Sequence, residues 1–143
     1  MNPLGVDAGP PRLSWILESQ RRGEVQTAWQ VLAASTAAKL ARNQGDLWDS
    51  GKTPSADSLG VVYGGQPLRS GQRVFWKVRV WDAAGRPSEY GPPAWFEMAL
   101  LSPGDWKALW IQRTSAGPIP ETQRFEDHPA PLFRKEFSLD KKV

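Results

Sequence analysis

The chain has 143 residues, 40% of them hydrophobic, which is enough to bury the core of one ordinary domain with a modest tail. It has no cysteine and a single histidine, His128, so disulfides, thiolate metal sites and the usual metal-binding clusters are excluded, and we expect no metal and no cofactor. The net charge of +3 comes from basic residues scattered among 15 acidic ones, so we expect no nucleic-acid partner.

The sequence also lacks the features of a membrane protein. No apolar run approaches the length of about 18 residues that a transmembrane helix needs. The start, Met1–Asp7, has no basic end followed by an apolar stretch, so it is unlike a signal peptide. If Met1 is the native start, we expect a cytoplasmic protein.

The first third of the chain predicts two strands and a short helix. Residues 3–11 are rich in proline and glycine and predict an extended lead-in. Residues 12–17 alternate and predict a first strand, and residues 25–35 predict a longer second strand that pairs beside it. Residues 36–45 are rich in alanine, begin at possible N-caps and end at glycine, so we expect a short helix there.

The strongest strand pattern in the sequence lies at residues 68–82, around which we expect the fold to be organised. One face carries Val74, Trp76, Val78 and Val80, and the other carries Arg73, Lys77 and Arg79, so one face is predicted to be buried and the other to meet water.

Shorter strand patterns flank this segment. In residues 47–52 an aromatic strand breaks at a Ser-Gly turn, where we expect Asp49 to bond the backbone of the turn. Residues 59–63 form a short apolar strand pattern, and residues 94–100 place Phe96, Met98 and Leu100 on one face.

Together these segments predict an all-β sandwich of the fibronectin type III or immunoglobulin-like type over residues 1–101. Residues 102–131 are proline-rich and without pattern, and we expect a linker. Residues 132–143 resume strand alternation, so we interpret them as a lone extra strand, the first strand of a following domain.

Several of these segments, in this order, resemble the N-terminal region of bacterial alpha-L-rhamnosidases, which are large glycosidases that remove terminal rhamnose. The matching stretches are Pro3–Asp7, Pro11–Trp15, Gln26–Trp29, Leu47–Lys52, Leu68–Asp82, Phe96–Leu101, Asp105–Trp106 and Trp110–Ile111. The resemblance implies a fibronectin type III-like domain, with residues 132–143 beginning the next β-sandwich domain. It also implies a tyrosine where this chain has Val74, so we expect the loop before this strand to be looser than in the family.

The acidic residues give no sign of a catalytic site. Glycoside hydrolysis needs two facing carboxyl groups about 5–10 Å apart, one of them in an apolar setting. The acids considered lie in turns (Asp49, Asp82), at an outward strand position (Glu97) or in the predicted linker (Glu121, Glu126, Asp127). The sequence around these acids does not predict burial for any of them, so we expect no catalytic site in this chain. The resemblance implies that the family's catalytic domain lies further along the polypeptide.

The eight tryptophans are the remaining candidates for function. Trp15, Trp29 and Trp76 fall on predicted core faces, whereas the sequence does not decide whether Trp48 and Trp81 are buried or exposed. The residues predicted to contact a neighbouring domain or a sugar are Trp95, Trp106 and Trp110. We favour contact with a domain, because exposed aromatic patches more often mark protein interfaces.

By resemblance, the expected function is that of a non-catalytic accessory module of an alpha-L-rhamnosidase. Its expected partners are the remaining domains of that glycosidase, with rhamnose-bearing glycans as a further candidate. The alternatives are a carbohydrate-binding module that uses exposed tryptophans and a free-standing protein-interaction domain.

Overall fold

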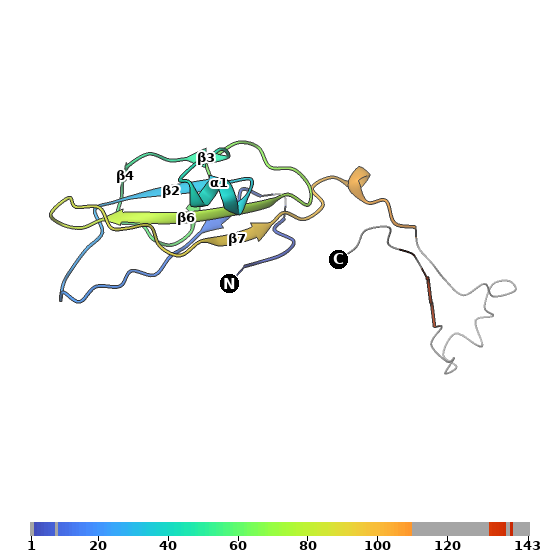
Figure 1. Cartoon of the computed structure of the whole chain (residues 1–143), viewed down its shortest axis with the longest axis horizontal. Helices are drawn as coiled ribbons and strands as arrows, with labels where there is room; N and C mark the ends of the chain where they lie inside the picture. The colour runs from blue at the N-terminus through green and yellow to red at the C-terminus, as the bar shows by residue number, and fades with distance from the viewer. Residues whose placement is uncertain (1, 8, 110–131, 137, 139–143) are drawn as a thin grey trace, which may run out of the picture. The chain divides into compact units, whose positions relative to one another are not determined.

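The computed structural model describes residues 2–7, 9–109, 132–136 and 138 (Figure 1). The chain divides into two compact units, Met1–Trp106 and Lys107–Val143. All strands and helices of the described residues belong to the first unit, which ends with a single 3-10 turn, η1 (Pro103–Asp105). Among the described residues, no helix has the length and apolar character that crossing a membrane requires.

The lone extra strand expected at residues 132–143 stays a prediction. Residues 132–136 and 138 carry no strand pairing. A strand requires a ladder partner, and the described residues of this unit supply none. The predicted boundaries at residues 101 and 131 stay predictions, and residues 110–131 of the expected linker lie outside the described residues.

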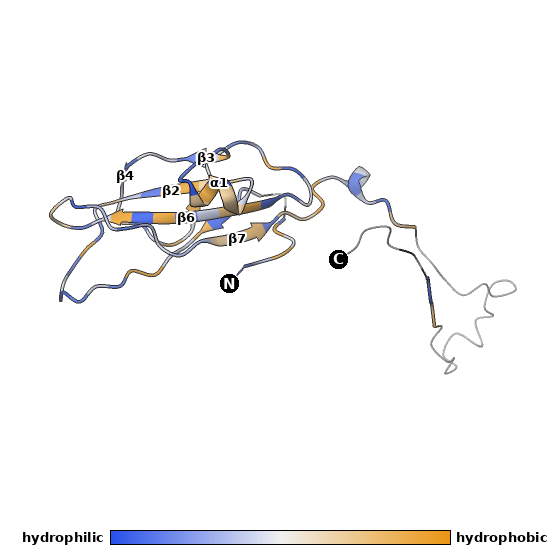
Figure 2. Ribbon diagram, viewed as in Figure 1, coloured by the Kyte–Doolittle hydropathy of each residue, from blue (hydrophilic) through white to orange (hydrophobic). Residues whose placement is uncertain are grey.

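The larger sheet has five strands, all antiparallel, with β2 (Ala28–Ala34) at its centre. On one side β2 pairs with β3 (Trp48–Asp49) and with β4 (Thr53–Pro54). On the other side it pairs along its whole length with β6 (Arg73–Trp81), the strand predicted as the organising element, and β7 (Ala94–Glu97) lies beyond β6. Figure 2 shows hydrophilic and hydrophobic residues alternating along β6.

The smaller sheet has two strands, β1 (Arg12–Leu13) and β5 (Val61–Val62). The predicted pairing of the first strand with the second was therefore wrong. The Tyr63 N–H donates to Pro11 O at 2.8 Å and the Trp15 N–H donates to Ser58 O at 3.0 Å, so β1 is held against β5 in the opposite layer. The chain then crosses to the larger sheet before β2 begins.

The core between the two sheets contains the inward row of β2 that the sequence predicted. Its buried members are Leu13, Trp29, Val31, Ala33, Tyr63, Val74, Phe96 and Met98. Leu100, which was predicted to face the core, is 47% exposed. The reason is that β7 ends at Glu97, so the alternation of faces is not maintained to Leu100.

The outer face of β2 is also buried, because a helix covers it. Helix α1 (Ala37–Ala41) begins after Thr36, whose Oγ1 accepts the N–H of Lys39 at 3.2 Å, which confirms the predicted cap. Leu40 of this helix packs on Leu32 and Ala34, so β2 has apolar residues on both faces.

The N-terminal lead-in joins the larger sheet at the free edge of β7. Pro3 O accepts the N–H of Glu97 at 3.1 Å, the Val6 N–H donates to Glu97 O at 2.9 Å, and Val6 forms a parallel bridge with Met98. The first extended segment of the chain therefore enlarges the five-stranded sheet and not the two-stranded one.

The loop before β6 is held by its own side chains, and Val74 has no hydroxyl to add to them. The N–H of Arg69 donates to Gln72 Oε1 at 2.8 Å, and the N–H of Leu101 donates to Ser70 Oγ at 2.8 Å. Whether the loop is looser than in the family stays a prediction.

Candidate binding surfaces

Three of the tryptophans form a chain of aromatic contacts inside the core. Trp29 meets Trp15 edge-to-face with ring centroids 5.8 Å apart and Trp48 at 6.3 Å, and Trp48 meets Tyr63 at 5.3 Å. Edge-to-face pairs of this kind add stability beyond the area they bury. The core assignment of Trp15 and Trp29 is confirmed, and Trp48, which the sequence left open, is also a core residue.

Trp95 lies half-buried on β7 and has a cation above its ring. The guanidinium of Arg73 lies 4.3 Å from the ring centroid and also donates to Glu97 Oε2 at 2.8 Å. The backbone N–H of Trp95 donates to Asn2 Oδ1 at 3.0 Å. One face of this indole is therefore occupied within the module.

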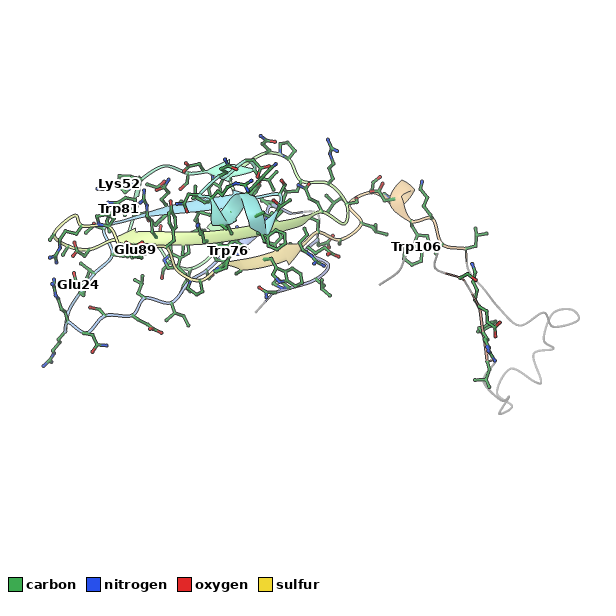
Figure 3. All side chains as sticks on the ribbon, in the orientation of Figure 1. Glu24, Lys52, Trp76, Trp81, Glu89 and Trp106 are labelled. Atoms are coloured by element: carbon green, nitrogen blue, oxygen red, sulfur yellow. The ribbon has the colours of Figure 1, made fainter. Side chains whose placement is uncertain are left out.

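Trp106 follows η1 and is 57% exposed. Figure 3 shows its side chain away from the strands, in contrast to Trp76 and Trp81. Trp110, the third candidate, lies outside the described residues. The contact role of these tryptophans stays a prediction.

A row of cations and aromatic rings covers the outer face of β6. Arg79 lies over the rings of Tyr90 (4.9 Å) and Trp81 (5.1 Å), while Lys77 lies over Tyr90 (4.7 Å) and Lys52 over Trp81 (5.1 Å). Burial lowers the pKa of Lys77. Lys77 and Arg79 were predicted simply to meet water, and the aromatic Trp81 on the same face of β6 was a signal for stacking.

Beside this row an apolar groove of about 460 Å³ lies between α1, β6 and the segment that leads into β7. Leu40, Phe75, Tyr90 and Trp95 line it, with Lys77 at its polar side. Trp95 therefore forms part of an apolar groove that has one charged residue, Lys77, in its lining.

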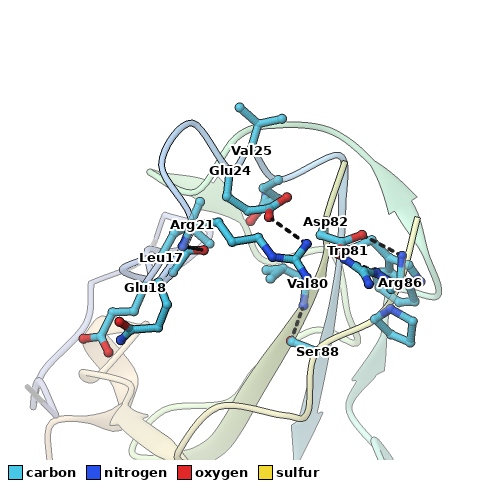
Figure 4. A pocket seen from close by; sticks show the side chains of 14 residues that line it. Leu17, Glu18, Arg21, Glu24, Val25, Val80, Trp81, Asp82, Arg86 and Ser88 are labelled. Carbon is cyan, nitrogen blue, oxygen red and sulfur yellow. Dashed lines mark hydrogen bonds and ion pairs between the residues drawn. The ribbon is translucent and has the colours of Figure 1, made fainter. Parts of the chain in front are cut away.

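A second pocket, of about 520 Å³, lies at the end of the sandwich between residues 17–26 and the loop 82–88 (Figure 4). Four of its charged side chains are paired: Arg21 lies 3.5 Å from Glu24, and Arg86 lies 2.7 Å from Asp82, while Glu18 also lines the pocket. The backbone N–H and side chain of Arg86 lower the pKa of Asp82. Sugar binding favours an open aromatic face, but the Trp81 ring in this pocket is 7% exposed.

The described carboxylates considered as catalytic candidates have structural partners. Asp49 Oδ1 accepts the N–H of Gly51 at 2.9 Å and Gln30 Nε2 at 2.6 Å, which confirms the predicted turn. Glu97 pairs with Arg73, as described above. Glu121, Glu126 and Asp127 lie outside the described residues. Within the described part of the chain, no cluster of three or more potential metal ligands occurs.

Asp46, which the sequence did not single out, has a strongly lowered pKa. Burial raises its pKa, but hydrogen bonds from Lys39 and Ser35 outweigh this and lower the pKa to about 2. The Lys39 ammonium lies 2.7 Å from Asp46 Oδ2. This pair links α1 to the segment before β3, so its role is structural.

A two-layer arrangement of antiparallel strands, with five strands facing two, defines an immunoglobulin-like sandwich domain. Residues 1–102 match the family described as the Rha78A-like N-terminal immunoglobulin domain. The match covers more than half of the chain, which therefore belongs to this family.

Several proteins named alpha-L-rhamnosidase are similar to this chain. The one from Streptomyces avermitilis is 47% identical over 124 residues, which are 87% of this chain and 12% of that protein. The one from Alteromonas sp. is 37% identical over 148 residues, covering 100% of this chain and 16% of that protein. The chain thus spans only 12–16% of the length of these relatives.

Two solved structures share the fold. The crystal structure of Streptomyces avermitilis alpha-L-rhamnosidase complexed with L-rhamnose matches with a TM-score of 0.72 and 50% identity, over 78% of this chain and 11% of that one. The alpha-L-rhamnosidase of Dictyoglumus thermophilum matches with a TM-score of 0.74 and 40% identity, over 78% and 12% of the respective chains.

Proposed function

We propose that this chain is a non-catalytic N-terminal module of an alpha-L-rhamnosidase, and that it packs against and orients the rest of that enzyme. The observation that supports this most is the match to a small N-terminal part of several alpha-L-rhamnosidases. The structural pairing of Asp46, Asp49, Asp82 and Glu97 is consistent with it, because none of these groups is placed as a general acid or nucleophile.

The test begins with the reading frame past Val143 and the intact mass of the native product. A product several times longer than this chain, with activity on an aryl α-L-rhamnoside, supports the proposal. In that product, deletion of residues 1–101 is expected to lower the temperature of inactivation, while the 143-residue chain alone shows no hydrolysis. A native product that ends at Val143 contradicts the proposal and favours a free-standing interaction domain.

Contact with rhamnose-bearing glycans is the second candidate, and the exposure of the Trp106 indole is the observation that favours it. Titration of the chain with L-rhamnose, followed by tryptophan fluorescence, tests it directly. A saturable change that disappears in Trp106→Ala supports a sugar contact. No change up to high ligand concentration removes this candidate and leaves the packing role intact.

A further inference from the structure

From Trp76 to Val80, the inner face of β6 is less covered than the inner face of its neighbour β2. The inward residues of β2, Trp29 and Val31, are 8% and 0% exposed, whereas Trp76, Val78 and Val80 of β6 are only half-buried. Both rows face the same side of one sheet. The difference arises because the opposite sheet has two strands, too few to cover five.

The small sheet also has an open edge on β1. Pro11 and Trp15 use their backbone groups to bond the β5 side, so the alternation of an antiparallel ladder directs the backbone groups of Arg12 and Ser14 the other way. In the part of the chain that the structure describes, β1 pairs only with β5. The N-terminal segment does not cover this edge, because Val6 pairs with Met98 in the large sheet.

A groove runs between this edge and β6. One hollow, of about 590 Å³, has Trp76, Val78 and Val80 on its β6 side and residues 14–18 along its wall. It shares Leu17, Glu18, Val80 and Ser88 with the end pocket of Figure 4, so the two hollows are continuous. On the wall, Ile16 is 89% exposed.

We propose that this groove, the strand slot, receives an extended segment of the polypeptide that follows this module in the parent enzyme. This inference rests on the proposed function. An added strand would bond the open edge of β1 through its backbone and place alternate side chains against the apolar row of β6. It would also cover an edge that folded proteins rarely leave exposed.

The length of the relatives argues for this occupant. The matched region is 12% of the Streptomyces avermitilis protein, so most of such a polypeptide lies outside the module and is tethered to it. A tethered segment reaches an effective concentration in the millimolar range, which a second copy of this chain does not normally reach. The occupant is therefore a covalently linked strand, and not a separate molecule.

Hydrogen–deuterium exchange of residues 12–17 tests the slot. The 143-residue chain and the native product, with its length known from intact mass, are compared under the same conditions. We expect the amides of Arg12 and Ser14, which face the open edge, to exchange at least about tenfold more slowly in the native product. Ile16→Lys, which places a charge on the edge, should abolish that protection. Leu59→Lys is the matched control, because Leu59 is 79% exposed and does not line the slot.

The outcomes separate the slot from the proposed function. Equal exchange in the chain and in a longer native product, or equal effects of the Ile16 and Leu59 variants, overturns the slot and leaves the accessory role standing. Protection that rises with the concentration of the isolated chain identifies a second copy as occupant and also overturns it. A native product of 143 residues would mean that no longer parent enzyme exists, and it would overturn both the slot and the proposed function.

Discussion

Gln26 is expected to be the most important polar side chain for the stability of the module. It is 5% exposed and makes three hydrogen bonds. Its Oε1 accepts Trp15 Nε1–H at 2.9 Å, and its Nε2 donates to Ser55 O at 3.1 Å and to Asp57 O at 2.9 Å. It therefore ties three segments together: the strand end at Trp15, the start of β2 and the segment after β4.

The substitution Gln26→Leu keeps the volume and removes all three bonds. A buried donor left without a partner costs about 1–3 kcal/mol, and Trp15 Nε1 becomes such a donor. Asp57 is exposed, so water replaces the bond to its carbonyl, whereas Ser55 is half-buried and loses more. We expect the free energy of unfolding to fall by about 2–3 kcal/mol in total.

The assay is urea unfolding of the chain followed by tryptophan fluorescence. With an m-value of about 2 kcal/mol per molar urea, the midpoint should fall by at least about 1 M. Gln20→Leu is the control, because Gln20 is exposed and should leave the midpoint unchanged. Trp15→Phe removes the donor while keeping an aromatic ring, and its coupling to Gln26→Leu should be about 1 kcal/mol. A midpoint within about 0.2 M of the wild type for Gln26→Leu would refute this reasoning.

Two further substitutions test other contacts. Asp46→Asn should lower the midpoint of thermal unfolding near neutral pH. The pKa of Asp46 is about 2 in the folded chain, below its ordinary value of 3.8. Its ionised carboxylate therefore stabilises the fold fully above pH 3.8, and this stabilisation is lost as the pH falls through about 2. The melting temperatures of the wild type and of Asp46→Asn should converge near that pH. Convergence that fails to occur would contradict this assignment. Gly65→Ala should lower the free energy of unfolding by about 3 kcal/mol or more, since an added Cβ would lie 2.5 Å from the Trp48 Cβ. Gly64→Ala, whose Cβ would lie 3.4 Å from the Trp48 ring, should cost clearly less by the same urea assay, and equal effects would be inconsistent with the clash.

Features that depend on neighbours in the sequence were predictable. The alternation in β6 identified Val74 as a core residue because side chains in a strand alternate between faces. The cap at Thr36 and the turn at Asp49 were also predictable, because each side chain bonds a backbone group two or three residues away.

Features that depend on distant partners were not predictable. The pairing of β1 with β5 joins residues about fifty positions apart, and two-residue strands carry no register signal of their own. Gln26 was missed because a glutamine next to a strand is ordinarily exposed, and its burial follows only from the carbonyls that meet it. Leu100 was assigned to the core because nothing local marks Glu97 as the end of β7.

The two faces of the large sheet are covered to different extents, and this difference affects which face is free to bind a partner. On the outer face, α1 and the rings under Lys77 and Arg79 cover part of the surface and leave the apolar groove beside α1, whereas the inner face is open along Trp76, Val78 and Val80 of β6. Gln26 anchors the wall of that opening through Trp15, so the slot exists before anything enters it. Preformed sites lose less conformational entropy on binding, so Gln26→Leu should weaken the protection of residues 12–17 in the native product even where the fold survives.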